Sequence, residues 1–385
     1  MEEALPLFLA LLTEDEEFDE DTAMMMMMLA MHEEEEQQRH RDAPLDDDER
    51  EPRVRLGYEA LCAKYSRHAF KLHFRFDKED IPRLAKALEM PVIKCPVTGA
   101  RAEPCDALLY VLKRHAYPIR WVDMDAFFGR AVSTLAGIVS ETLRFLYNHW
   151  VVRIVLHMDV ERLDPGKLGE FANAIYAVTE TANIAAFIDG TVRRFCRPGG
   201  ADINQQAMYS GHKRWHGYNY EALYTPDGIL IRVIGPFDGR RHDMHMLHEG
   251  NLIAILLEWF GDYHVYGDLG YPIIGNLLAG WKGKNLPAHR DRFNKRMSRA
   301  RVAIEQAFGH WVSTFKFVQH YQNLKPRLQA IPLIHLVTVL LTNCHVCLYP
   351  TSHPTCSMFD CEPPELEDYL SDFDPAYYAG LGLPI

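Results

Sequence analysis

The amino-acid sequence predicts a mixed α/β fold in which a helical region precedes a sheet. Three observations support this prediction. Apolar residues recur at helical spacing from about residue 55 to 160, and from about residue 183 they follow the pattern of strands. The order of the later segments, three strands, a helix, a fourth strand and further helices, is typical of a mixed sheet covered by helices.

The helical region, residues 53–165, has a layout that resembles a helix-turn-helix. A short helix that starts near Asp123 is followed by a break around Gly129, a cap at Ser133 and a longer helix with Leu146 on its apolar side. Any small helical bundle produces the same pattern, and the longer helix offers only Arg144 to DNA phosphates. Both interpretations, helix-turn-helix and plain bundle, therefore stay open.

Four runs with the composition of strands follow. The second and third are joined by Pro226-Asp227-Gly228, which is strong turn chemistry. The first and the fourth end in Asp189 and Asp268, and strands of this kind can lie side by side in a mixed sheet. The four runs are residues 183–189, 214–225, 228–235 and 262–268.

A later helix carries a third carboxylate, Glu305. This residue lies at the margin of an apolar stripe, with Arg301 one helical turn before it. On this segment alone, a surface pair between Arg301 and Glu305 is the plainer interpretation. The stripe consists of Phe293, Met297, Ala300, Ile304, Phe308 and Trp311, and the helix also carries the cations Arg292, Lys295, Arg296, Arg299 and Arg301.

Charge is distributed unevenly along the chain. Residues 1–51 hold 19 acidic and 3 basic side chains, whereas residues 52–356 have a net charge of +11. We predict that residues 1–52 form a disordered acidic region and residues 351–385 an acidic tail. The basic body is compatible with a polyanionic partner. We also expect no membrane partner, because no apolar run approaches the length of a bilayer span and no basic leader begins the chain.

The cysteines allow a competing metal interpretation. Eight cysteines over 385 residues are too sparse for a disulfide scaffold and fit a reducing compartment. Cys344, His345 and Cys347, followed by His353, Cys356 and Cys361, have residue types that bind zinc, but their spacing is irregular. We interpret Cys344 and Cys347 as small core residues and keep structural zinc as the alternative.

Four short motifs carry a family resemblance. In chain order they are FIDGT (187–191), GRRHD (239–243), GDLGYP (267–272) and IEQAFG (304–309), with 36 residues between Asp268 and Glu305. Together they resemble the successive signatures of the PIF/Harbinger transposases, which are DDE superfamily endonucleases. The resemblance covers most of residues 180–348, so the nuclease domain is placed at residues 180–350.

This resemblance implies an RNase H-like fold with Asp189, Asp268 and Glu305 as the catalytic triad. It also implies two Mg²⁺ or Mn²⁺ ions, for which carboxylate oxygens are suitable ligands. The family carries an aspartate after a histidine at this point, which Asp243 matches, so it is a candidate auxiliary metal ligand, but it also stands where a helix begins. Both roles of Asp243, metal ligand and helix cap, stay open.

The implied activity is metal-dependent DNA cleavage and strand transfer. The implied partners are DNA, in the form of transposon ends or target DNA, and a separate Myb/SANT-like DNA-binding protein. The implied location is the nucleus, with the cytoplasm left open, and a homo-oligomer is compatible with the family. The alternative is a domesticated, catalytically silent protein that binds DNA or serves as a chromatin scaffold.

Overall fold

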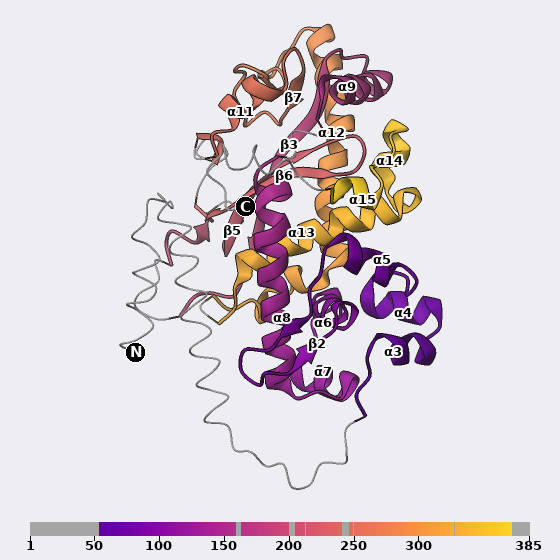
Figure 1. The fold of residues 1–385 in the computed structure, drawn as a ribbon. Coiled ribbons are helices and arrows are strands. Elements are labelled where there is room, and N and C mark those ends of the chain that lie inside the picture. Colours follow the sequence, from indigo (N-terminus) through magenta and orange to yellow (C-terminus); the bar gives the residue numbers. More distant parts are fainter. Residues whose placement is uncertain are drawn as a thin grey trace, which may run out of the picture.

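The computed structural model describes residues 54–158, 163–199, 205–211, 213–240, 246–248, 250–326 and 328–371. These residues form a mixed α/β fold in which the N-terminal helices gather at one end and the sheet lies toward the other (Figure 1). One hydrophobic cluster runs through both parts. The predicted acidic region, residues 1–52, lies outside the described residues.

Helices dominate the chain before the sheet. The segment PCDALLYVLKRHAYP predicts a helix from about Asp106 to His115; the structure confirms this helix, which begins two residues earlier and ends one residue later. The elements are α3 (Tyr58–Lys64), α4 (Arg67–Phe74), α5 (Asp80–Ala87), β1 (Ile93–Lys94), β2 (Arg101–Ala102), α6 (Pro104–Ala116), α7 (Trp121–Phe128), α8 (Val132–Leu146), the π-helical segment η1 (Tyr147–Leu156) and α9 (Pro165–Thr179).

The helix pair α7 and α8 is joined by a turn at Gly129. Gly129 has a φ of 66°, and a Cβ there would lie 2.2 Å from the carbonyl oxygen of Val54, so the turn requires glycine. α8 packs against α6, α7 and η1, and its only cation, Arg144, donates to Glu141 Oε1 at 2.7 Å. The only cation of α8 is therefore paired on its own helix.

The sheet is mixed, with β3 in its centre. β3 pairs antiparallel with β5, which pairs antiparallel with both β4 and β6; on its other side β3 pairs parallel with β7, which pairs parallel with β8. The predicted turn at residues 226–228 is confirmed, since it joins β5 to β6. The strands are β3 (Ile184–Arg194), β4 (Tyr209–Ser210), β5 (Trp215–Tyr224), β6 (Leu230–Asp238), β7 (His264–Tyr266) and β8 (Leu277–Leu278).

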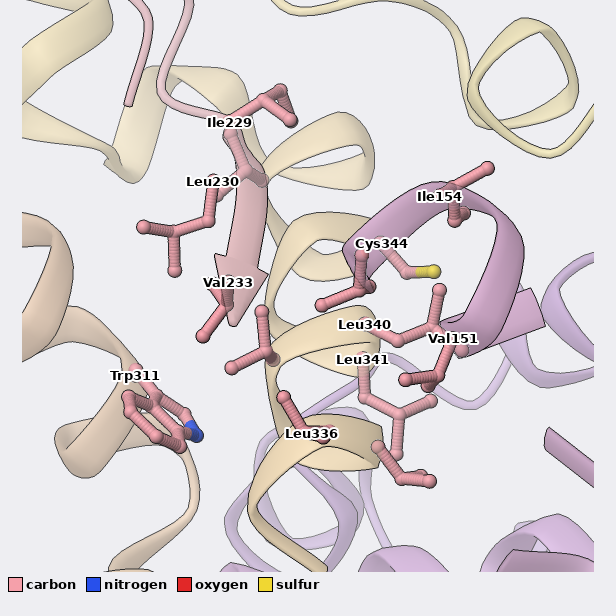
Figure 2. Packing of buried hydrophobic residues seen from close by; sticks show 14 of the residues in the cluster. Val151, Ile154, Ile229, Leu230, Val233, Trp311, Leu336, Leu340, Leu341 and Cys344 are labelled. Carbon is pink, nitrogen blue, oxygen red and sulfur yellow. The ribbon is translucent and has the colours of Figure 1, made fainter. Parts of the chain in front are cut away.

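Two long helices pack around the sheet, α12 (Ala288–Thr314) and α13 (Ile331–Leu348). α13 is the central core helix. Figure 2 shows its side chains between a strand, β6, and two helical segments, α12 and η1. The labelled residues are Leu336, Leu340, Leu341 and Cys344 of α13, Leu230 and Val233 of β6, Ile229 just before β6, Trp311 of α12, and Val151 and Ile154 of η1.

The prediction that no apolar run reaches the length of a bilayer span is wrong for α13. This helix is long and apolar enough to cross a membrane by length and composition alone. In the structure, however, 89% of its 18 residues are buried inside the protein. A helix that is apolar all round is expected where neighbours cover every face, so the composition of α13 follows from its central position.

The folded part of the chain extends beyond the predicted boundary at residue 350. Residues 350–371 form η4 (Pro350–Ser352), α14 (Pro354–Phe359) and α15 (Leu366–Tyr369). Tyr369 is buried, and its hydroxyl accepts a hydrogen bond from Asn343 Nδ2 at 2.8 Å. Two acidic side chains of this stretch, Glu365 and Glu367, form ion pairs with Arg83. Residues 372–385 lie outside the described residues.

Five histidines are enclosed by the fold. Burial lowers the pKa of His310 to about 4, and the pKa values of the other four to about 3. The five are His115, His310, His335, His345 and His353, and the rings of His310 and His353 have centroids 4.7 Å apart. These side chains stay neutral in the folded state at pH values where the unfolded chain binds protons.

The stability of the protein should therefore fall below pH 6.5. Each depressed histidine pKa contributes stability that is present above the unfolded value and is lost as the pH falls toward the folded value. His353→Gln is expected to reduce the slope of the unfolding free energy against pH. Near pH 5.5 the reduction should be about 1.4 kcal/mol per pH unit, which corresponds to one proton fewer taken up on unfolding. Urea denaturation at several pH values measures this slope. An unchanged slope would contradict the neutral, buried state of His353.

Candidate active site

The parallel pairing of β3 with β7 brings Asp189 and Asp268 to the same level. Phe187 is opposite Tyr266 in this register. Asp189 follows Phe187 by two residues, and Asp268 follows Tyr266 by two residues. Adjacent strands are about 4.8 Å apart, so the two carboxylates start from neighbouring points of the backbone. The prediction that these two strands lie side by side is confirmed.

β3 does not end at Asp189 as the apolar run predicts. It continues to Arg194, and residues 190–194 remain paired with β5. What changes at Asp189 is burial, since residues 184–188 are fully enclosed and residue 189 is not. The reason is that β7 stops at Tyr266, so the β7 side of β3 opens at the level of Asp189.

Local contacts fix the position of each aspartate. A Cβ on Gly267 would lie 2.7 Å from Tyr271 Cδ2 and 3.0 Å from Ile188 Cγ2, so glycine lets the chain before Asp268 pass close to both Tyr271 and β3. Asp268 Oδ1 accepts a hydrogen bond from the backbone N–H of Gly270 at 2.7 Å. Asp189 Oδ1 accepts one from the N–H of Gly190 at 2.9 Å. Each aspartate is thus held by a backbone N–H in its own segment.

The third carboxylate, Glu305, is linked to Asp189 through Arg301. Arg301 Nη1 donates to Asp189 Oδ2 at 2.7 Å, and Arg301 Nη2 donates to Glu305 Oε1 at 2.8 Å. The predicted pair of Arg301 with Glu305 is confirmed. The contact with Asp189 was not predicted, because it joins residues 112 positions apart. One guanidinium therefore bridges a strand carboxylate and a helix carboxylate.

The helix stripe explains how α12 presents Glu305. Met297, Ala300, Ile304 and Trp311 are buried as predicted, and the predicted members Phe293 and Phe308 pack partly buried against the core. The Glu305 side chain is 54% exposed, whereas that of Arg301 is 20% exposed. The stripe holds α12 against the sheet, and its margin faces the carboxylates.

The electrostatics of Asp189 show a concentration of negative charge. The pKa of Asp189 is raised to about 6, mostly by burial and in smaller part by the charges of Asp268 and Glu305. Arg301 and the Gly190 N–H oppose this rise but do not cancel it. The same charges reach Tyr266, the last residue of β7: burial raises its pKa, Arg301 lowers it and Asp268 raises it. Tyr266 therefore lies near Arg301 and Asp268. The sequence motifs did not reveal this residue.

The donor set fits a hard divalent cation in its chemistry. The three carboxylates offer only oxygen ligands, and Asp189 and Glu305 already share one cation, the guanidinium of Arg301. With the side chains as they lie, no group of three or more His, Cys, Asp or Glu residues in the described part of the chain is arranged to hold a metal ion. Asp243, the proposed auxiliary ligand, lies outside the described residues.

Residues 188–343 match the family model of the DDE superfamily endonucleases. The matched segment includes Asp189, Asp268 and Glu305, and it supports assignment of this part of the chain to a nuclease superfamily. Neither the comparison with curated proteins nor the comparison with solved structures found a match.

Within the segment that matches the DDE endonucleases, most cations of α12 fall into two groups. Lys295 and Arg296 are paired with Asp291 and Glu180, and Arg301 is held between the carboxylates. Arg292 and Arg299 are exposed, and neither has an acidic partner among the residues that the structure describes. These two arginines, and Arg290 over the ring of Trp281, can contact phosphates without first losing an ion pair to a residue that the structure describes.

The cysteines of the competing zinc interpretation lie in and beside the core. Cys344 and Cys347 are buried on α13, which confirms that they are small core residues. Cys356 is also buried, and its Sγ lies 3.3 Å from the carbonyl oxygen of Asp227. The packing of these side chains against apolar neighbours explains why this helix accepts cysteine.

Proposed function

We propose that this protein is a Harbinger-type DDE transposase, or a nuclease derived from one, that cleaves DNA with Mg²⁺ or Mn²⁺. The observation that carries the proposal is the register of β3 with β7, which aligns Asp189 with Asp268, together with the link from Asp189 to Glu305 through Arg301. The three carboxylates come from three separate segments of the chain, and all three lie within residues 188–343, which match the DDE endonucleases.

Asp189, Asp268 and Glu305 are the residues that would hold the metal ions. In a two-metal mechanism such ions activate the attacking oxygen and stabilise the leaving oxygen of the phosphodiester. The protein supplies a rigid sheet edge for the two aspartates and an anchored helix for the glutamate. The strand order β6-β5-β3-β7-β8, with three antiparallel strands followed by two parallel ones, supports the RNase H-like fold that the family implies.

The proposal extends to partners and location. DNA is the substrate, and a Myb/SANT-like protein supplies sequence recognition and nuclear import. Support for a separate recognition protein comes from α8, whose only cation is already held by Glu141. A homo-oligomer is the form in which two such sites would act on two DNA ends.

Metal binding tests this function without depending on turnover. Titration calorimetry should show Mn²⁺ binding by the full chain, and Asp268→Asn should weaken it by at least about tenfold. Asp123→Asn is the matched control. Asp123 lies on α7 in the N-terminal helical region, where it pairs with Arg120, so its loss should leave Mn²⁺ binding unchanged. Absence of Mn²⁺ binding by the unaltered protein would contradict the nuclease and leave the catalytically silent scaffold.

A further inference from the structure

An exposed tryptophan lies beside the candidate active site. Trp281 follows Gly280 in the segment between β8 and α12. A Cβ on Gly280 would lie 3.0 Å from the Tyr266 hydroxyl oxygen and 2.9 Å from Leu269 Cδ2. Tyr266 ends β7, and Leu269 directly follows Asp268. Trp281 therefore directly follows a glycine that lies against Tyr266 and Leu269, beside the carboxylate site.

Trp281 is held in place although it is exposed. Its backbone N–H donates to Asn294 Oδ1 at 2.9 Å, and its carbonyl oxygen accepts from Asn294 Nδ2 at 2.9 Å. The guanidinium of Arg290 lies over its ring, 3.9 Å from the centroid. Even so, 42% of the residue is exposed. A large aromatic side chain that is anchored but left in water is typical of a contact surface.

Cations without acidic partners among the described residues lie near this tryptophan in the sequence. Lys282 and Lys284 follow it in the loop, and Arg292 lies near the start of α12; all three are exposed. None of the three has an ion pair with another residue in the part of the chain that the structure describes, in contrast to Lys295 and its partner Asp291. An aromatic platform among free cations is the arrangement that binds single-stranded nucleic acid, because bases stack on the ring and phosphates contact the cations.

We propose that Trp281 is a stacking platform for an unpaired base of the DNA next to the scissile phosphate. Lys282, Lys284 and Arg292 would contact the phosphates of the same strand. This inference rests on the proposed nuclease function and adds to it the state of the substrate: the strand near the cut is unpaired at one base or more. It predicts that the protein prefers frayed or single-stranded DNA over fully paired duplex.

The test measures binding without metal and without cleavage. The probe is a 12-nucleotide DNA strand with a central 2-aminopurine, used alone and as a paired duplex, in EDTA. Trp281→Ala is expected to weaken binding of the single strand by about tenfold, whereas binding of the duplex should change less than twofold. Quenching of 2-aminopurine by stacking should be lost in this variant and retained in Trp281→Phe.

Two further variants complete the test. Tyr117→Ala removes another exposed aromatic residue, after α6, and should leave single-strand binding unchanged. Trp281→Leu keeps apolar bulk without an aromatic face, so it repeats the test if alanine disturbs the loop. Equal weakening of single strand and duplex, or full quenching in both non-aromatic variants, would overturn the proposal. Because no metal is used, this result is independent of whether Asp189 and Asp268 support cleavage.

Discussion

Asp189→Asn is expected to lower Mg²⁺-dependent nicking of supercoiled DNA by about a thousandfold or more. The substitution keeps the shape of the side chain and its hydrogen bond from the Gly190 N–H, but it removes the charge that a divalent cation requires. Asp189 is the most enclosed of the three carboxylates and is close enough to the other two for their charges to raise its pKa. Loss of this single charge therefore affects every cation shared within the site.

The measurement is the rate of conversion of supercoiled to nicked plasmid. Asp291→Asn is a suitable control, because Asp291 is a partly exposed carboxylate at the start of α12 that pairs with Lys295. Its nicking rate should stay within about twofold of the unaltered protein. If Asp189→Asn nicked DNA at the unaltered rate, the assignment of the catalytic site to this sheet edge would be wrong.

Arg301→Gln is expected to have two opposite effects. Without metal, Asp189 and Glu305 lose the cation that they share, so the free energy of unfolding should fall by about 2–4 kcal/mol. With metal, the cation that competes for the same carboxylates is gone, so Mn²⁺ affinity should rise by about tenfold. Addition of Mn²⁺ should then restore more stability to this variant than to the unaltered protein.

Thermal unfolding with and without Mn²⁺, combined with calorimetry, measures both effects. Arg296→Gln is the matched control, because Arg296 lies on the same helix and pairs with Glu180 outside the site. That variant should leave Mn²⁺ affinity unchanged. A weaker Mn²⁺ affinity in Arg301→Gln would show that Arg301 supports the metal site and does not compete with it.

Much of the fold could be predicted because its signals are local. The stripe of α12 depends on residues three and four apart, and the turn at Gly228 depends on three consecutive residues. β8 has only two residues, too few for an alternating pattern to identify it. Cys344 and Cys347 of α13 were predicted to be core residues, but this helix was not expected to be long and apolar enough to span a bilayer, although an apolar run of 18 residues has the same composition in a protein core as in a membrane.

The sequence predicted which residues form the candidate site, but it did not predict how these residues are arranged in space. The motifs named Asp189, Asp268 and Glu305, but Arg301 was expected to contact only the neighbour one turn away. Its second contact, with Asp189, depends on how α12 packs on β3. Tyr266 and Trp281 carry no motif, and their proximity to the site follows from the close approach of Gly280 to β7.

The sequence by itself determined which side chains carry charge, which faces of the helices are apolar, and the order in which the carboxylates occur along the chain. The tertiary structure decided that Asp189 and Asp268 share one level of a parallel pair, that Arg301 joins Asp189 to Glu305, and that Trp281 is anchored beside them. The difference arises from the separation along the sequence over which each interaction acts. Periodicity and turn chemistry act between residues a few positions apart, whereas strand register and ion pairs join segments separated by more than 70 residues.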